Sequence, residues 1–171
     1  MANEVWEYRM DGTESVQLLD YLGNPADAKG FFTEFNPPEI TKSFDTDQRL
    51  GEKGVNPRPM AIEEMSSELT LKGISTEFAN AVAIAFGANK RISMILSGSA
   101  KSRYTDGTAN MVTTVKGHLK KLPTPMFKAN ETSELSMELA VSYYAQTLGN
   151  FSLVIDLDLN KFEVNGVNQW S

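Results

Sequence analysis

The sequence predicts a mainly β protein, with two packed antiparallel sheets in a sandwich or barrel-like arrangement and one flanking α-helix. Three observations lead to this fold class. Apolar and polar residues alternate over long stretches, which is the period of half-buried strands. Turn signals built from Gly, Pro and Asn separate these stretches. A helical period is clear only in residues 75–86. The 171 residues suit a single domain spanning 1–171.

The N-terminal part begins with a polar arm, residues 1–12, whose Trp6 and Tyr8 need an apolar surface on this domain or on a neighbouring subunit. Residues 13–22 leave two interpretations open, because Val16, Leu19 and Leu22 have helical spacing but a strand at 15–19 is equally compatible. The alternatives differ in which face is buried.

Short extended segments follow. Residues 23–25 (Gly-Asn-Pro) mark a turn. Residues 31–35 read as a short strand, which the prolines at 37–38 end because proline lacks the N–H of a central strand. Residues 40–45 resume an extended run.

Residues 46–59 predict a long loop, because they contain two glycines, two prolines and no core-forming pattern. Two interpretations remain open: a surface excursion, or a segment that orders against a neighbouring subunit. In the second case the contacts would come from its charged residues, which are Asp47, Arg49, Glu52, Lys53 and Arg58.

The helix is predicted between two strand regions. Residues 60–72 form a strand with Leu69 and Leu71 on one face. Ser75 then caps a helix, and Gly87 ends it. Its apolar residues recur every four positions and are Phe78, Val82 and Phe86.

Two hairpins complete the predicted fold. Residues 92–96 and 111–119 pair around an Asp-Gly turn at 106–107, and prolines 123 and 125 mark a loop. In the C-terminal region apolar residues stand at the odd positions from Leu135 to Tyr143, and again from Phe151 to Leu159. A period of two over two runs predicts two half-buried strands joined by a turn at 148–150.

Charge and composition exclude several classes of function. The chain has no cysteine, which excludes disulfides, zinc–thiolate sites and thiol catalysis. The net charge is −6, from 16 basic and 22 acidic residues. Residues 131–171 hold six of the acidic residues against Lys161 alone, a net −5. This acidic segment argues against tight nucleic-acid binding, which needs clustered Lys and Arg.

No motif predicts an enzyme. His118 is the single histidine and has no partner for a metal cluster or a triad in the sequence. Residues 156–160 (D-x-D-x-N) begin like a calcium loop, but Lys161 and Val167 stand where glycine and glutamate are required, so we interpret them as the polar face of a strand. We expect no catalytic residue, metal site or cofactor.

Five short stretches carry a family resemblance. They are FNPPEI at 35–40, VKGHLK at 115–120, AVSYY at 140–144, Ile-Asp at 155–156 and VNGV at 164–167. In this order and spacing they resemble the major tail tube proteins of contractile-tailed bacteriophages and R-type pyocins. The resemblance covers residues from about 31 to 168. The segment between residues 12 and 31 is longer than the family's N-terminal hairpin, and the chain after Val167 is shorter.

The resemblance implies a fold similar to the type VI secretion tube protein and a structural function. Six copies would form a ring, and rings would stack into the inner tail tube of a virion, inside a sheath protein and between baseplate and terminator proteins. Phage DNA would pass through the lumen without specific binding. Assembly is expected in the host cytoplasm, without stable membrane association. The alternatives are the tube of a phage-tail-like bacteriocin and a monomeric β-sandwich binding module.

Three sets of residues are expected to serve such an assembly. Glu134 and Glu138 share one strand face and would line an acidic lumen that repels phosphates. The charged residues of 46–59 would make contacts between rings. Trp6, Tyr8 and Trp170, at the two ends of the chain, would contact neighbouring subunits.

Overall fold

The computed structural model describes residues 5–8, 15–19, 25–27, 32–51, 53–124, 129–130, 132 and 134–170. Within these residues the chain forms thirteen strands and the helix α1 (Thr76–Gly87). The prediction of a mainly antiparallel β fold with one helix is confirmed. The strands are β1 (Trp6–Tyr8), β2 (Ser15–Leu19), β3 (Pro25–Asp27), β4 (Phe32–Asn36), β5 (Lys42–Asp47), β6 (Asn56–Ile62), β7 (Met65–Leu71), β8 (Ile92–Ser102), β9 (Thr108–Lys121), β10 (Leu135–Leu148), β11 (Phe151–Asp156), β12 (Lys161–Val164) and β13 (Val167–Asn168).

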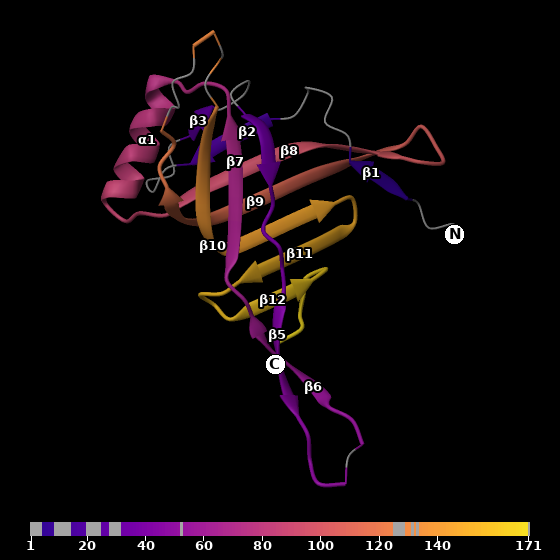
Figure 1. Cartoon of the computed structure of the whole chain (residues 1–171). Coiled ribbons are helices and arrows are strands. Elements are labelled where there is room, and N and C mark those ends of the chain that lie inside the picture. The colour runs from indigo at the N-terminus through magenta and orange to yellow at the C-terminus, as the bar shows by residue number, and fades with distance from the viewer. Residues whose placement is uncertain are drawn as a thin grey trace.

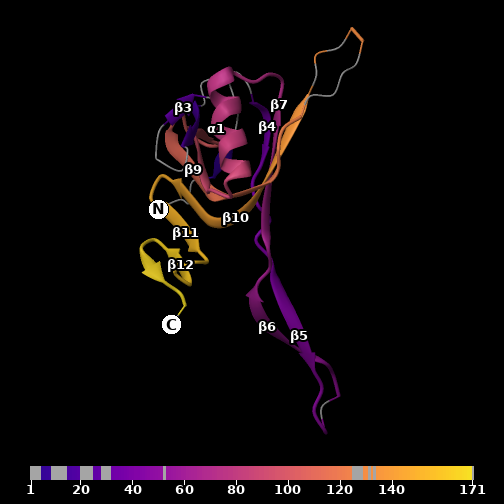
Figure 2. The same ribbon diagram turned by 90° about the vertical axis from the view of Figure 1, so that its left-hand side faces the viewer.

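The long strand β10 joins two layers of sheet. The main path runs β13-β12-β11-β10-β9-β8-β2-β3, and every pairing is antiparallel. On the edge opposite β9, the first half of β10 pairs with β7 and its second half pairs with β11. Strand β7 pairs in turn with β4. Figure 2 shows α1 between the β4–β7 layer on one side and β3 and β9 on the other. The two layers therefore belong to one continuous sheet.

The core lies between these layers and under α1. Alternate residues of β7 and β10 point into it, as the alternation predicted, and α1 contributes Phe78, Val82 and Ala85. The Phe78 ring meets the edge of Phe32 from β4 at a centroid distance of 5.9 Å. The helix thus closes one end of the layered sheet with apolar side chains.

The helix begins after Ser75 and ends at Gly87 as predicted, but its apolar stripe differs. Ser75 Oγ accepts a hydrogen bond from the Phe78 N–H at 3.2 Å, so Ser75 is the N-cap. The prediction that Phe86 belongs to the apolar stripe is wrong, because Phe86 is 42% exposed and Ala85 is buried instead. A spacing of four and then three, from Phe78 through Val82 to Ala85, follows the 3.6-residue turn more closely than a strict repeat of four. The left-handed residue after the helix is Asn89 (φ 53°), whereas Gly87 is still helical.

Near the N-terminus, the strand interpretation of residues 15–19 is confirmed and the helical one is wrong. Strand β2 pairs with β8 along its whole length, and Leu18 is fully buried. The local spacing of apolar residues fits a helix or a strand, and pairing with the central strand β8 stabilises the strand. Of the turn predicted at residues 23–25, residues 23 and 24 lie outside the described residues, as does the proline at 125, whereas Pro25 is the first residue of β3.

The loop predicted at residues 46–59 is shorter in the structure, because residues 46–47 belong to β5 and residues 56–59 belong to β6. The segment is the outer part of a hairpin in which β5 pairs with β6. This hairpin projects from the body as a long arm (Figure 1). Pro57 and Pro59 are tolerated in β6 because β5 is its single partner strand in the described chain, so β6 is an edge strand. Residues 60–72 accordingly form two strands, with a break between Ile62 and Met65.

The interpretation of residues 156–160 as a strand face is also wrong. Strand β11 ends at Asp156, whose Oδ1 accepts hydrogen bonds from the N–H groups of Asp158 (3.1 Å) and Leu159 (3.2 Å). Asn160 adopts a left-handed conformation with φ 51°. These residues form the turn into β12, because a local carboxylate–backbone interaction competes with strand pairing.

Candidate assembly surfaces

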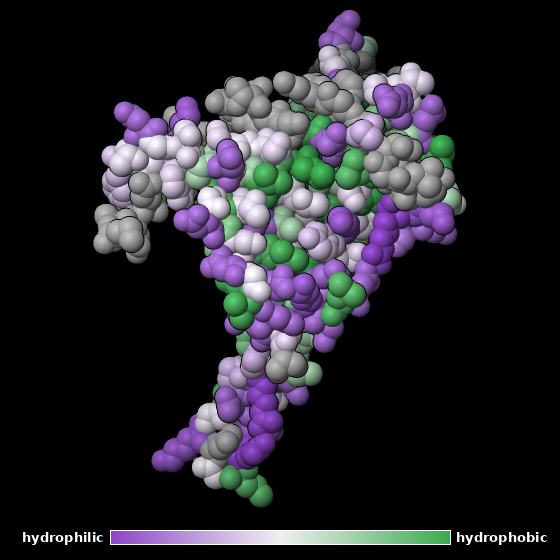
Figure 3. All heavy atoms as spheres, turned by 180° about the vertical axis from the view of Figure 1, so that it is seen from behind, coloured by the Kyte–Doolittle hydropathy of each residue, from purple (hydrophilic) through white to green (hydrophobic). Residues whose placement is uncertain are grey.

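The arm formed by β5 and β6 exposes apolar side chains that no part of the described chain covers. Phe44 is 60% exposed and Met60 is 56% exposed, and Leu50 at the tip is fully exposed. In Figure 3 the arm carries apolar side chains at its tip among hydrophilic ones. A two-stranded hairpin on its own is at best marginally stable in water. The arm therefore has the composition of a segment that packs against something else.

Four of the predicted charged residues are described on this arm, and one of them, Asp47, forms ion pairs with two others. The Asp47 carboxylate lies 3.2 Å from Arg49 Nε and 3.2 Å from Arg58 Nη2. Lys53 is exposed in the turn, and Glu52 lies outside the described residues. Because all three side chains of the cluster are well exposed, these ion pairs contribute little to stability.

An acidic groove of about 610 Å³ lies where the arm leaves the body. Residues from the two roots of the arm, from β7 and from β10 line it, and they are Asn36, Pro37, Glu39, Thr41, Glu63, Glu64, Ser66, Glu68 and Glu138. No group of His, Asp or Glu in the described part of the chain is arranged to hold a metal ion.

Glu138 lies in this groove and has two partners. Its Oε1 accepts a hydrogen bond from Ser66 Oγ at 2.8 Å and lies 3.9 Å from Lys120 Nζ. Lys120 Nζ is closer to Glu64, at 2.5 Å. The hydrogen bond to Glu64 is the main cause that raises the Lys120 pKa above its ordinary value. Glu134, just ahead of β10, is exposed and does not line the groove.

Both tryptophans predicted for subunit contacts pack on their own chain. Trp6 is half-buried in β1, which pairs with the end of β8, and the Trp170 ring packs on Phe162 at 5.7 Å. Tyr8 remains 55% exposed. Burial and, to a smaller extent, the proximity of Tyr8 raise the pKa of the Tyr144 phenol.

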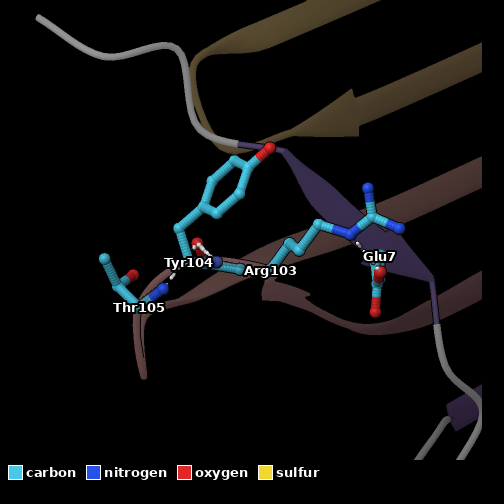
Figure 4. Close-up of polar contacts among 5 residues, drawn as sticks. Glu7, Arg103, Tyr104 and Thr105 are labelled. Carbon is cyan, nitrogen blue, oxygen red and sulfur yellow. Dashed lines mark hydrogen bonds and ion pairs between the residues drawn. The ribbon is translucent and has the colours of Figure 1, made fainter.

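The pairing of β1 with β8 is reinforced at the tip of the β8–β9 hairpin. Figure 4 shows Arg103 reaching across to Glu7, with Nε and Oε1 3.1 Å apart. The N–H groups of Tyr104 and Thr105 donate to Ser102 Oγ at 3.3 Å each, which forms the turn. Tyr104 is 68% exposed. The first strand is thus anchored, and this tip presents one exposed tyrosine.

Several strand edges are open within the described residues. The main sheet ends in β13 at one side and β3 at the other, and β4 pairs with β7 alone. Unpaired edges are sites where a second chain can add. No helix in the described part of the chain is both long and apolar enough to span a membrane.

Comparison with known families shows which family the chain belongs to. The model of the family described as phage tail tube protein FII matches residues 19–171. The chain belongs to this family. Tail tube proteins are structural and not enzymatic, so the absence of a predicted catalytic site agrees with the family. No curated protein sequence matches the chain.

Solved structures share the fold of this tail tube protein. A chain from the baseplate of the anti-feeding prophage is 13% identical, with a TM-score of 0.57 over 86% of this chain and 97% of that chain. The SPP1 tail tube is 12% identical, with a TM-score of 0.55 over 86% and 81%. A chain from the sheath/tube terminator of an extracellular contractile injection system is 16% identical, with a TM-score of 0.50 over 82% and 98%.

Sequence reasoning missed the apolar side of the arm. It singled out the charged residues of 46–59, whereas the exposed apolar residues Phe44 and Met60 lie just outside that window. The available signal was the spacing of a strand: Phe44 and Thr46 are two positions apart, and so are Pro57 and Pro59. Composition alone made the segment look like a loop.

Proposed function

We propose that six copies of this tail tube protein form a ring and that the rings stack into the hollow inner tube of a contractile tail, through which phage DNA leaves the capsid. The observation that carries the proposal is the arm, an apolar and charged hairpin that extends beyond the body and is not covered by any other described part of its chain. The family match supports the tube itself. A bacteriocin tube would use the same contacts.

Open strand edges support ring closure. The edges at β3, β4 and β13 are short, and pairing between neighbours would cover them. A contact between different surfaces of identical chains closes into a ring when the rotation allows it. Tyr8, the most exposed of the three terminal aromatics, would meet a neighbouring subunit in this arrangement.

The arm supports stacking, with Asp47, Arg49, Lys53 and Arg58 on the part that would reach the next ring. Glu134 and Glu138 would face the lumen, where negative charge keeps DNA from adhering. The sheath, baseplate and terminator proteins are the further partners of such a tube, which would be assembled in the host cytoplasm.

Shortening the arm tests the stacking function. Replacing residues 46–57 by Asn-Gly would join Asp45 to Arg58, which face each other, through a two-residue turn. We expect a folded protein that forms no long tubes, because the body and its core are untouched. Circular dichroism and negative-stain electron microscopy measure the two properties. Long tubes from the shortened protein would refute the function of the arm.

A further inference from the structure

The two edges of the arm differ in their backbone chemistry. Along an antiparallel strand, N–H groups point alternately toward the partner and away from it. Pro57 and Pro59 lie opposite Thr46 and Phe44, at alternate positions of β6. Since proline has no N–H, the donors that hold β6 to β5 come from the positions between, such as Arg58. The prolines therefore face the free edge of β6, which lacks donors there.

The free edge of β5 is open. Phe44 and Thr46 face the prolines across the hairpin, so their own N–H and C=O groups point away from β6. No other strand of the described chain pairs with β5. An unpaired edge with free donors and acceptors is a template for adding a strand from another chain. One edge of the arm is thus blocked and the other is available.

The two faces of the arm also differ. Cross-strand partners share a face, so Phe44, Pro57 and Pro59 lie on the same side together with Thr46. The opposite side carries Asp45, Asp47 and Arg58, the last two of which form an ion pair. The first side is apolar and exposed, and the second is charged. A ribbon with one apolar face and one open edge is shaped for a partner that approaches from a single direction.

We propose that the arm docks on a second copy of this chain by adding the free edge of β5 to a strand of that copy, with the Phe44 face turned toward the copy's body. The inference rests on the proposed function, because stacked rings bring every arm to another copy. The contact joins different surfaces of identical chains, so it can repeat from ring to ring without closing. The proline edge of β6 then stops further strand addition and limits each arm to one partner strand.

The substitution Thr46→Pro tests the edge directly. It removes an outward N–H and no hydrogen bond within the hairpin, and residue 45 is already extended. Thr46→Ala is the matched control, because it truncates the same side chain and keeps the N–H. We expect Thr46→Ala to form tubes like the wild type and Thr46→Pro to remain unassembled, measured by sedimentation and electron microscopy, with circular dichroism to verify folding.

Hydrogen exchange on the wild-type protein provides a second measurement that needs no variant. The amides of Phe44 and Thr46 should exchange roughly tenfold or more slowly in the assembled protein than in the monomer, the effect of a hydrogen bond gained at each. Tubes from Thr46→Pro, or unprotected amides in wild-type tubes, would overturn the strand addition while leaving the tube function intact. A wild-type protein that never assembles would overturn both.

Discussion

At the scale of single residues, Gly117 shows how closely two strands approach. It lies in β9 opposite Val141, where the register of β10 shifts by one residue before Tyr143. A Cβ at position 117 would lie 2.0 Å from the Ala140 carbonyl oxygen and 2.8 Å from its carbon. The β-bulge brings the β10 backbone over Gly117. Any residue with a Cβ at this position would therefore push that backbone away.

Gly117→Ala should therefore destabilise the folded chain by about 2 to 3 kcal/mol, as overpacking against fixed backbone does. Chemical denaturation of the monomer measures the change. Gly73→Ala is the matched control, because an added Cβ there meets no atom within 4 Å; its free energy of unfolding should stay within about 0.5 kcal/mol of the wild type. Equal effects of the two substitutions would contradict the close approach.

At the scale of elements, the helix depends on its first turn. The Ser75 hydroxyl satisfies the Phe78 N–H, and Phe78 is fully buried against Phe32 of β4. Ser75→Ala leaves that N–H without its partner and should lower the free energy of unfolding by about 1 kcal/mol. Thermal or denaturant unfolding measures it. Ser75→Asp restores the hydrogen-bond acceptor and should recover most of the lost free energy of unfolding. If it does not, the loss in Ser75→Ala has a cause other than the missing cap.

Elements that bury a face against their own chain could be predicted from the sequence. The alternation in β7 and β10 and the apolar stripe of α1 arise because one side of each element meets the core. The arm could not be predicted in this way, because Phe44 and its neighbours face no part of the described chain. Its prolines then read as loop signals, although they stand at the outer edge of a strand.

At the scale of the whole molecule, the acidic groove could not be predicted from the sequence. Glu39, Glu64 and Glu138 are far apart along the chain and meet because β7 pairs with β10 on one edge and with β4 on the other. The sequence predicted that Glu134 and Glu138 share a strand face, but Glu134 lies just ahead of β10. The sequence could not indicate that Glu138 would accept a hydrogen bond from Ser66, since that contact depends on the register between β7 and β10.

The acidic wall proposed for the lumen leads to a prediction about DNA transfer. Replacing Glu134 and Glu138 by lysine should leave tubes able to assemble but slow DNA ejection, because the added positive charge attracts phosphates. Ejection kinetics of phage carrying the double variant measure the effect. Replacement of both by glutamine is the control, and it should slow ejection less. If DNA ejection is unchanged in intact tubes that carry both lysines, these two residues do not line the lumen.

Electron microscopy of the purified wild-type protein at high concentration tests the central claim most directly. We predict sixfold rings that stack into hollow tubes, with the β5–β6 arm of each subunit in contact with the adjacent ring. Tubes whose arms point into solvent would contradict the proposed function of the arm. A protein that stays monomeric at every concentration, with its arm exposed, would contradict self-assembly itself.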